Sequence, residues 1–355
     1  MWSIFASLRR TLAHGHATPA TQAAETEFSF ESEWAGFLAH LKLPPHTLHD
    51  VVVAGSLDPH FRYRRFWKSK RNGGQREIAE PDSRLKRLQH RIIARYLGTE
   101  QAHPAAVAYQ RGKSTADHVW EHAGAEVVVT ADIQDFFPNT RADRVEAWWR
   151  ERVDNDTAQL LTLLTTDRGG LPQGAPTSPA LSNFVNRELD TRLAQRAIAA
   201  GATYTRYCDD LAFSWPMGFG PPAGFEASLR TTLHEFGYTL HPTKGWHIYD
   251  RRDEPEITGV ILTRSGGVRL PDRLRQVMRK LASSPDPHDA QRLDGYLGYA
   301  AMMTRGAKRW RKLKKGARTK PAPETPWGGS SGENLPMPHA STPAAVGEAE
   351  DDIPF

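Results

Sequence analysis

A Tyr-Cys-Asp-Asp run at positions 207–210 constrains this chain most, because it places two adjacent acids between two apolar stretches. The flanking stretches, residues 203–207 and 211–214, predict the two strands of a β-hairpin with the acids at its tip. A third acid, Asp132, ends another strand-like stretch, residues 126–131. Adjacent aspartates are common in ordinary turns, so the hairpin alone does not indicate chemistry.

Three carboxylates at neighbouring strand ends can hold two divalent cations side by side. Such a pair stabilises the attacking and leaving oxygens of an in-line phosphoryl displacement. We therefore predict that Asp132, Asp209 and Asp210 are catalytic residues and metal ligands. Two Mg²⁺ ions are the expected cofactor, since Mg²⁺ prefers a few carboxylates together with substrate phosphates. The alternative is that the three acids are structural turn residues.

Composition and length set broad limits on the chain. Its 355 residues can bury one large core or form two or three subdomains. The mean hydropathy of −0.57 predicts a soluble protein, and no stretch approaches the roughly 18 apolar residues of a membrane span. In the first ten residues the charges follow the apolar stretch, the wrong order for a secretory signal. The single cysteine, Cys208, excludes an internal disulfide. We expect a cytoplasmic protein with no membrane partner.

Charge is divided unevenly along the chain. The net charge is +5, but residues 321–355 contain six acids and no Lys or Arg, so residues 1–320 carry +11. A basic body of this kind favours polyanions, most simply nucleic acid. The segment 321–355 is rich in Pro, Gly, Ser and acid, and we expect it to be disordered because it cannot bury enough apolar surface.

The pattern along the chain predicts an α+β protein. Two short helices are expected between residues 31 and 57, and a basic hairpin over residues 61–80. The other expected elements are helices over 83–97, 141–165, 177–200, 221–238 and 271–318, and strands over 126–132, 203–214, 256–263 and 267–270.

Three motifs in this order resemble those of reverse transcriptases. They are Asp-Ile-Gln-Asp-Phe-Phe at 132–137, Leu-Pro-Gln-Gly-Ala-Pro-Thr-Ser-Pro at 171–179 with Ser-Asn at 182–183, and the hairpin at 204–214. The resemblance covers roughly residues 31–315. It implies a right-hand polymerase with fingers, a palm built on an antiparallel sheet and a small helical thumb. The implied division is an N-terminal extension (1–30), fingers and N-terminal helices (31–125), palm (126–264), basic helical thumb (265–320) and acidic tail (321–355).

The resemblance also implies roles for single residues. The backbone carbonyl of Ile133 would add an oxygen ligand for the metal ions. Phe137 occupies the position of the aromatic gate under the incoming sugar, where a ring excludes a ribose 2′-hydroxyl. Its alternative is ordinary core packing. Gln173 and Gly174 lie in the loop that contacts the template–nucleotide pair, where a glycine permits close backbone approach.

Three basic residues are expected to bind the incoming deoxynucleoside triphosphate. Arg76 matches the arginine of the fingers that holds the phosphates, and Lys68 lies nearby on the same hairpin. Lys244 matches the palm lysine that neutralises or protonates the leaving pyrophosphate. For Arg76 and Lys68, the alternative is a solvated surface charge.

Among reverse transcriptases the resemblance is to the bacterial retron type. That type uses a partner structured non-coding RNA as template, starts synthesis from a guanosine 2′-hydroxyl and makes a branched RNA–DNA hybrid (msDNA), commonly in anti-phage defence with an effector protein. The retron motif Asn-Ala-x-x-His keeps only its last residue here, as His122, and Val-Thr-Gly becomes Ile-Thr-Gly at 257–259. A non-retron defence enzyme, a group II intron-like enzyme and a catalytically quiet RNA-binding scaffold remain alternatives.

Two segments near the end of the sequence predict macromolecular contacts. Residues 305–320 hold nine basic residues and no acid, which favours RNA binding through phosphates with a tryptophan available to stack. The RNA-binding residues predicted there are Lys308, Arg309, Trp310, Arg311, Lys312, Lys314 and Lys315. The final segment resembles the acidic tip of bacterial single-stranded DNA-binding proteins, which docks on host repair and replication proteins. Its predicted docking residues are Asp351, Asp352, Ile353, Pro354 and Phe355.

Overall fold

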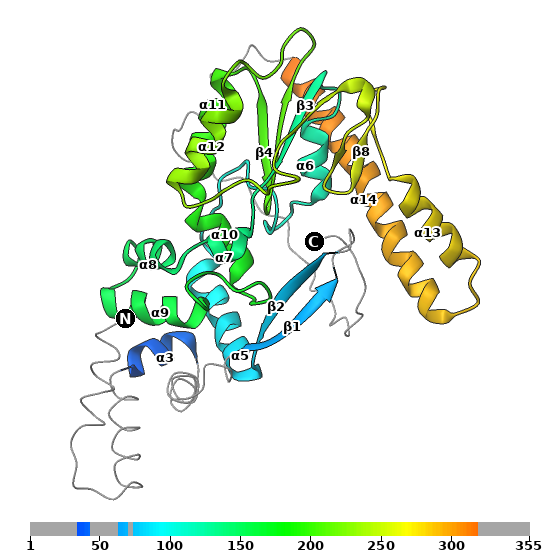
Figure 1. Cartoon of the computed structure of the whole chain (residues 1–355). Coiled ribbons are helices and arrows are strands. Elements are labelled where there is room, and N and C mark those ends of the chain that lie inside the picture. Colours follow the sequence, from blue (N-terminus) through cyan, green and yellow to red (C-terminus); the bar gives the residue numbers. More distant parts are fainter. Residues whose placement is uncertain (1–33, 43–62, 70–73, 319–355) are drawn as a thin grey trace, which may run out of the picture. The chain divides into compact units, whose positions relative to one another are not determined.

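The computed structural model describes residues 34–42, 63–69 and 74–318, with side chains as far as residue 306 (Figure 1). The chain divides into two compact units. Unit 1 comprises the described residues up to Ser114 together with Glu126–Ile248, and unit 2 comprises Thr115–Ala125 and the described residues from Tyr249 onward. The expected disordered tail and N-terminal extension lie outside the described residues.

Three strands of a four-stranded sheet form the centre of unit 1. The strands of this sheet are β3 (Val127–Asp132), β4 (Thr203–Tyr207), β5 (Asp210–Trp215) and β6 (His247–Asp250), in the order β4-β5-β3-β6. Both β3 and β4 pair antiparallel with β5. Every residue of β5 after Asp210 is buried. This confirms the predicted hairpin at 203–214, whose turn consists of Cys208 and Asp209.

Helices cover this sheet through its apolar side chains. Helix α11 (Arg187–Ala199) packs against β4 and lies beside α12 (Phe225–Glu235), as Figure 1 shows. Phe213 is fully buried and stacks on Tyr204, with ring centroids 4.9 Å apart, and Phe225 meets it edge-on at 5.3 Å. The core therefore fixes the strands immediately behind the hairpin turn.

The predicted basic hairpin is confirmed as β1 (Tyr63–Ser69) paired antiparallel with β2 (Gln75–Pro81). Helix α5 (Ser83–Ile92) begins directly after it, because Asp82 caps the helix by accepting from the backbone N–H groups of residues 84 and 85. It continues as a short π-helix, η2 (Ile93–Leu97). Of the two helices expected before the hairpin, one is α3 (Ala35–Leu41), and the rest of that segment lies outside the described residues.

Three segments of unit 1 that were predicted to be helical are helical over only part of their length. The segment 141–165 forms two helices, α8 (Ala142–Arg150) and α9 (Asn155–Thr165), because Asp154 caps the second one through the Thr157 N–H. The segment 177–200 divides into α10 (Ser178–Val185) and α11 at Asn186. The amide of Asn186 donates to the Ser182 carbonyl and its oxygen accepts from the Tyr238 hydroxyl, which holds this residue at the break. The helix expected over 221–238 is confined to α12.

Unit 2 combines a small sheet with helices. Helix α6 (Thr115–Glu121) packs on α14 (Pro287–Arg318), and α13 (Asp272–Ala282) packs on α14 as well. The segment expected to be helical over 271–318 forms two helices, which residues 283–286 separate. The indole N–H of Trp120 donates to the Met303 carbonyl at 3.0 Å, which joins α6 to α14.

The three-stranded sheet of unit 2 contains β7 (Glu256–Ile257), β8 (Val260–Leu262) and β9 (Val268–Arg269) and follows a short 3₁₀ helix, η3 (Arg251–Asp253). The single strand expected over 256–263 is a hairpin instead. Thr258 and Gly259 both have positive φ, 46° and 81°, as a two-residue turn of this kind requires. In the described part of the chain, no helix is both long and apolar enough to span a bilayer.

Candidate active site

The three predicted catalytic acids meet at one end of the central sheet. Asp132, the last residue of β3, lies directly opposite Asp210, the first residue of β5. Opposite residues of an antiparallel pair direct their side chains to the same face. The N–H of Ile133 donates to the Asp209 carbonyl at 3.0 Å, so the hairpin turn lies against the end of β3. The chain therefore brings together the residues that the sequence predicted to converge.

The acids do not form a closed metal cage by themselves. Among the described residues, no group of three or more His, Cys, Asp and Glu side chains is arranged to hold a metal ion. Mg²⁺ in phosphoryl-transfer sites is usually held by one or two carboxylates, with waters and substrate phosphates completing its shell. Two opposed carboxylates and a third on the adjacent turn fit that open arrangement, with the Ile133 carbonyl as a further oxygen donor.

Asp209 lies in an unusual electrostatic environment. Burial raises the pKa of its carboxyl group above the usual range, while the positive charges of Arg76 and Lys244 act in the opposite direction. The two cations are far from Asp209 in sequence, so the fold alone gives them this influence. Two of the predicted phosphate-binding residues are therefore close enough to the catalytic turn to affect its charge.

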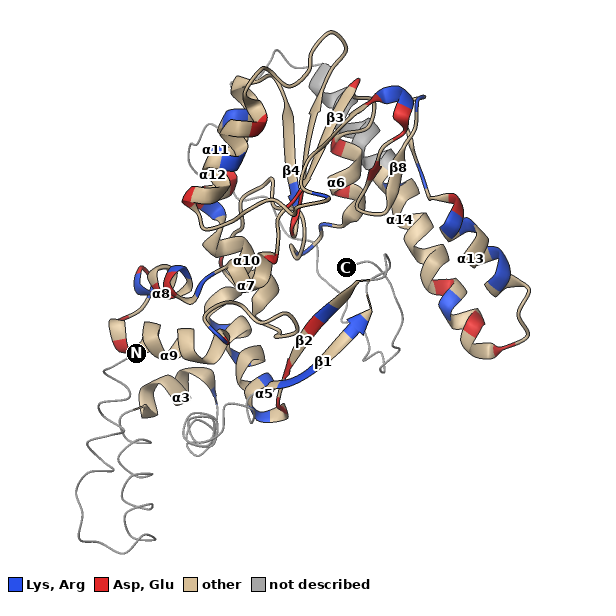
Figure 2. Cartoon of the chain, in the orientation of Figure 1, with Lys and Arg blue, Asp and Glu red and all other residues tan. Residues whose placement is uncertain are grey.

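Arg76 and Lys68 lie directly opposite each other on the β1–β2 hairpin. Like charges in opposed positions repel, and an anion bound between them removes that cost. The Nε of Arg76 is buried and has no hydrogen-bond partner among the residues that the structure describes. A buried donor left unsatisfied costs about 1–3 kcal/mol. The Nε–H of Arg76 is therefore suited to donate a hydrogen bond to an oxygen of a bound phosphate. Figure 2 shows the basic residues along β1.

Gln173 and Gly174 are held against β2. The Ala79 N–H donates to the Gln173 carbonyl at 2.8 Å. Gly174 has a φ of 128°, and a Cβ there would come within 2.8 Å of the Ala79 carbonyl oxygen. Only glycine fits this approach. The loop is therefore fixed on the strand that carries Arg76, which places it beside the predicted phosphate site.

Phe137 lies on the short helix α7 (Phe136–Asn139), which follows the first catalytic strand. Its neighbour Phe136 is buried and stacks on Tyr238, whereas Phe137 is only partly buried. The ring of Phe137 contacts Tyr109, with centroids 6.2 Å apart. Phe136 therefore packs in the core, and part of the Phe137 side chain remains accessible to solvent.

Lys244 is exposed on a loop that is held beside the acids. The Gln134 N–H donates to the Thr239 carbonyl at 2.9 Å, and the His241 N–H donates to the Asp132 carbonyl at 2.8 Å. These bonds attach the segment before Lys244 to the end of β3. Its ammonium group remains accessible to a ligand.

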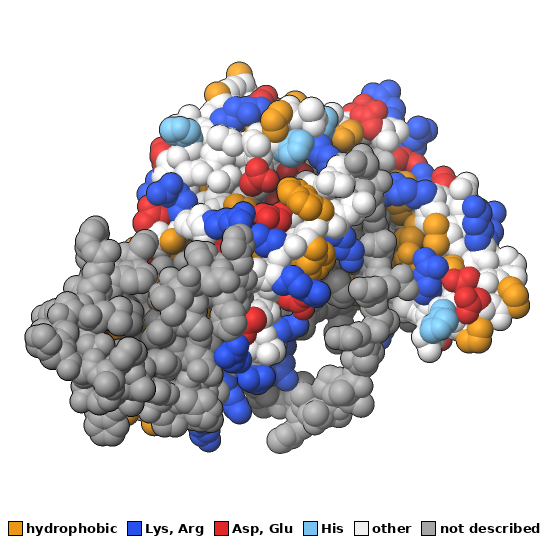
Figure 3. Space-filling model, turned by 60° about the horizontal axis from the view of Figure 1, so that its bottom comes forward, with side chains coloured by type: hydrophobic (Ala, Val, Ile, Leu, Met, Phe, Trp, Pro, Cys, Tyr) orange, Lys and Arg blue, Asp and Glu red, His pale blue; other side chains and the backbone are white. Residues whose placement is uncertain are grey.

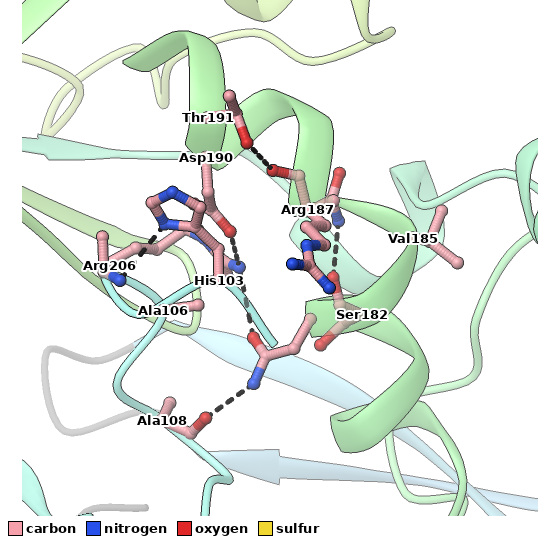
Figure 4. A network of polar contacts seen from close by, with 12 residues as sticks. His103, Ala106, Ala108, Ser182, Val185, Arg187, Asp190, Thr191 and Arg206 are labelled. Atoms are coloured by element: carbon pink, nitrogen blue, oxygen red, sulfur yellow. Dashed lines mark hydrogen bonds and ion pairs between the residues drawn. The ribbon is translucent and has the colours of Figure 1, made fainter. Parts of the chain in front are cut away.

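A buried polar network behind the hairpin was not predicted from the sequence. The Arg206 guanidinium donates to both carboxylate oxygens of Asp190, at 2.8 and 2.6 Å, and both side chains are fully buried. It also donates to the Cys208 carbonyl at 3.0 Å and to Asn183 Oδ1 at 3.1 Å. Figure 4 shows how the network joins α10, α11 and β4. It fixes the residue that precedes Asp209.

No pattern in a single sequence reveals this network, because its members lie on different elements. Arg206 occupies a strand position at which a charge alternating with apolar residues indicates solvent exposure, yet it is buried. Asp190 belongs to a helix whose other charges are mostly exposed. Their pairing depends on how α11 packs on β4.

The remaining predicted sites are described only in part or not at all. Residues 308–315 belong to α14, but their side chains lie outside the described part. The predicted docking residues 351–355 lie outside the described residues altogether. His122, the remnant of a retron motif, is fully buried in unit 2.

Comparison with known proteins supports the motif-based resemblance. A family model described as reverse transcriptase (RNA-dependent DNA polymerase) matches residues 68–262, more than half of the chain. The retron Mx162 reverse transcriptase of Myxococcus xanthus is 32% identical over 247 residues, which cover 61% of this chain and 50% of that protein. The retron Mx65 reverse transcriptase of the same organism is 33% identical over 266 residues, covering 68% of this chain and 61% of the relative.

The retron Ec86 reverse transcriptase of Escherichia coli is 27% identical over 249 residues, covering 64% of this chain and 74% of that protein. This chain therefore spans between 50% and 61% of the length of the two Myxococcus relatives. The matched region contains the opposed acids, the hairpin turn, Arg76 and the Gln173–Gly174 loop. The α+β fold and the resemblance to retron enzymes are confirmed, and the chain belongs to the reverse transcriptase family.

Proposed function

We propose that this chain is an RNA-directed DNA polymerase of the retron type. The observation that carries the proposal is the register of β3 and β5, which opposes Asp132 to Asp210 beside the turn residue Asp209. Arg76 and Lys244 act on the charge of that turn, as residues that handle a polyphosphate would. A scaffold without activity has no need for a partly buried carboxylate on which two cations act.

Each residue has a task in nucleotidyl transfer. Asp132, Asp209 and Asp210, with the Ile133 carbonyl, would hold two Mg²⁺ ions, which supply charge stabilisation for the attacking and leaving oxygens. Arg76 and Lys68 bind the triphosphate, and Arg suits phosphate because its planar fork donates two parallel hydrogen bonds. Gln173 and Gly174 contact the template–nucleotide pair.

Two further residues complete the proposed reaction. Phe137 presents its ring to the sugar and excludes a 2′-hydroxyl. Lys244 neutralises or protonates the pyrophosphate as it leaves. Bond formation joins the primer hydroxyl oxygen to the α-phosphorus, and the bond from that phosphorus to the pyrophosphate oxygen breaks.

An incorporation assay tests the activity. The full chain is given an RNA template, a primer, deoxynucleoside triphosphates and Mg²⁺, and extension is followed on a gel. We expect primer extension that EDTA abolishes. Binding of Mn²⁺ with a nucleotide, followed by electron paramagnetic resonance, checks the metal site independently, and this signal should disappear in Asp209→Asn. A folded wild-type protein that neither extends the primer nor binds Mn²⁺ would contradict the proposal.

The retron assignment adds a partner RNA and a branched product. The protein would use a structured non-coding RNA as template and start from a guanosine 2′-hydroxyl, in a system that serves anti-phage defence with an effector protein. Co-expression with the RNA encoded beside the gene should yield DNA that remains attached to RNA until a debranching enzyme is added. Linear DNA with no RNA attached would indicate another type of reverse transcriptase.

Two surfaces are proposed to bind macromolecules. In unit 2, α13 carries Arg273, Arg275, Arg279 and Lys280 (Figure 2), and the basic segment of α14 follows. Figure 3 shows Lys and Arg side chains in several patches on the face that it draws. We assign the residues at 308–315, with those of α13, to RNA phosphates. Neutralising four of them should weaken RNA binding and reduce its salt dependence.

The acidic residues and Phe355 of the final segment are proposed to dock host repair or replication proteins, with the aromatic side chain as anchor and the acids on a basic rim. Deleting Phe355 should abolish capture of such proteins while primer extension continues at the wild-type rate. Equal capture by the truncated chain would contradict this assignment.

A further inference from the structure

Tyr109 joins the proposed sugar-selecting ring to the catalytic turn. Its hydroxyl donates to the Cys208 Sγ at 3.2 Å, and Cys208 is the residue immediately before Asp209. Its ring lies 6.2 Å from that of Phe137, tilted by 47°, a spacing at which aromatic rings attract each other. One side chain therefore contacts both parts of the site.

The backbone at Tyr109 is held in a strained conformation. Its φ is 62°, in the left-handed region that few residues other than glycine adopt. The two residues before Tyr109 are fixed by hydrogen bonds: the Val107 N–H donates to the Arg206 carbonyl at 2.7 Å, and Asn183 Nδ2 donates to the Ala108 carbonyl at 2.7 Å. Strain of this kind persists where the surroundings determine it, and it concentrates at functional sites.

The ring of Tyr109 is not simply part of the core. It is 39% exposed, whereas Cys208 is buried. An aromatic ring placed only for packing would be covered, as Phe136 is. Tyr109 and Phe137 together form a partly accessible aromatic pair at the end of the sheet that carries the acids.

We propose that Tyr109 is a positioning residue for sugar selection, which sets the place of the Phe137 ring against the sugar of the incoming nucleotide. This inference rests on the proposed polymerase activity. The Tyr109 ring packs against Phe137 on one side, and its hydroxyl is attached to the catalytic turn. The contact between the two rings places Phe137, and the hydroxyl contact adds little because a thiol sulfur is a weak acceptor. Removal of the ring leaves Phe137 free to move away from the sugar and admits a ribonucleotide.

Three substitutions at this position test the proposal. Tyr109→Ala removes the ring, Tyr109→Leu keeps apolar volume without an aromatic face, and Tyr109→Phe is the matched control that removes the hydroxyl alone. The measurement is kcat/KM for deoxyribonucleotide and ribonucleotide incorporation on one RNA template with Mg²⁺. Melting temperatures show which variants fold, and Phe137→Ala serves as the reference for a lost gate.

We expect the preference for deoxyribonucleotide to fall by about threefold to tenfold in Tyr109→Ala and Tyr109→Leu, the value of one aromatic contact. Tyr109→Phe should stay within about twofold of wild type, since a thiol sulfur is a weak acceptor.

If the folded Ala or Leu variant loses activity with both nucleotides equally, Tyr109 is merely structural and the proposal is overturned. An unchanged preference in Phe137→Ala overturns it too. A wild-type protein that incorporates no nucleotide refutes the polymerase assignment itself.

Discussion

The central sheet of unit 1 and helices α13 and α14 of unit 2 are stabilised in different ways. In β4 and β5 nearly every residue is buried, and the charged Arg206 is fully satisfied by Asp190, Asn183 and the Cys208 carbonyl. In α13, by contrast, Leu281 is the one buried residue, and the basic side chains of this helix face solvent. A site for chemistry needs atoms fixed to a fraction of an ångström, whereas phosphate contacts along a nucleic acid need only charge at roughly the right place.

Removing one of the proposed catalytic acids tests whether the central sheet of unit 1 carries the chemistry. This change has the largest expected effect. Asp132→Asn or Asp209→Asn keeps the side-chain shape but removes a charge that would hold metal. Metal stabilisation is worth several kcal/mol, so we expect incorporation to fall at least about a thousandfold with an unchanged melting temperature. Asp135→Asn, at an exposed neighbouring position, is the control and should keep wild-type activity.

Breaking the buried pair behind the hairpin tests whether the sheet depends on it. Arg206→Met or Asp190→Leu alone leaves an uncompensated buried charge, which costs about 3–5 kcal/mol. The double variant should lose clearly less than the sum, as urea unfolding will show. The exposed pair of Arg192 and Glu235, 2.8 Å apart, is the control, and Arg192→Met should cost under about 1 kcal/mol. Additive losses in the buried double variant would show that the two charges are not coupled.

The contact between α6 and α14 can be tested with two glycines of one helix. A Cβ at Gly306 would come within 2.8 Å of both Ala116 Cβ and Trp120 Cδ1. We expect Gly306→Ala to lower the free energy of unfolding of unit 2 by about 1–2 kcal/mol through overpacking. At Gly298 a Cβ would meet nothing within 4 Å, so Gly298→Ala should stabilise the helix by about 0.5–1 kcal/mol. Equal effects at both positions would contradict the close packing.

Two buried histidines of unit 2, His118 and His122, predict that stability depends on pH. Burial lowers the pKa of His122 from 6.5 to about 3, and burial also lowers that of His118, whose ring lies 5.8 Å away. The unfolded chain therefore binds more protons below pH 6.5, so stability is full above this pH and falls as the pH drops toward 3. We expect a loss of about 1.4 kcal/mol per pH unit for each histidine.

Urea unfolding at pH 7.0 and 5.5 will measure this loss. His122→Gln should reduce the slope, and His234→Gln, at an exposed position of α12, should not. An unchanged slope in His122→Gln would mean that the histidine does not carry the effect.

The sequence by itself determined the elements that carry the proposed site. Apolar stretches that end in acids predicted β3, β4 and β5, because strand propensity and turn chemistry are local properties. The order of the three motifs placed the chain among reverse transcriptases, and the Asp82 cap and the β1–β2 hairpin were also readable from local pattern. The sequence pattern was less reliable for the number of helices in a helical segment. A helix-compatible composition runs through residues 151–154 and Asn186, yet side-chain hydrogen bonds separate two helices at each of these places.

Only the tertiary structure decided which distant residues act together. The opposition of Asp132 and Asp210, the influence of Arg76 and Lys244 on Asp209, and the burial of Arg206 with Asp190 all depend on strand register and helix packing. The double contact of Tyr109 with Phe137 and Cys208 depends on a loop fixed in a left-handed conformation. Such relations arise between side chains as far as 133 positions apart, as with Arg76 and Asp209, and no local sequence pattern encodes a distance across the fold.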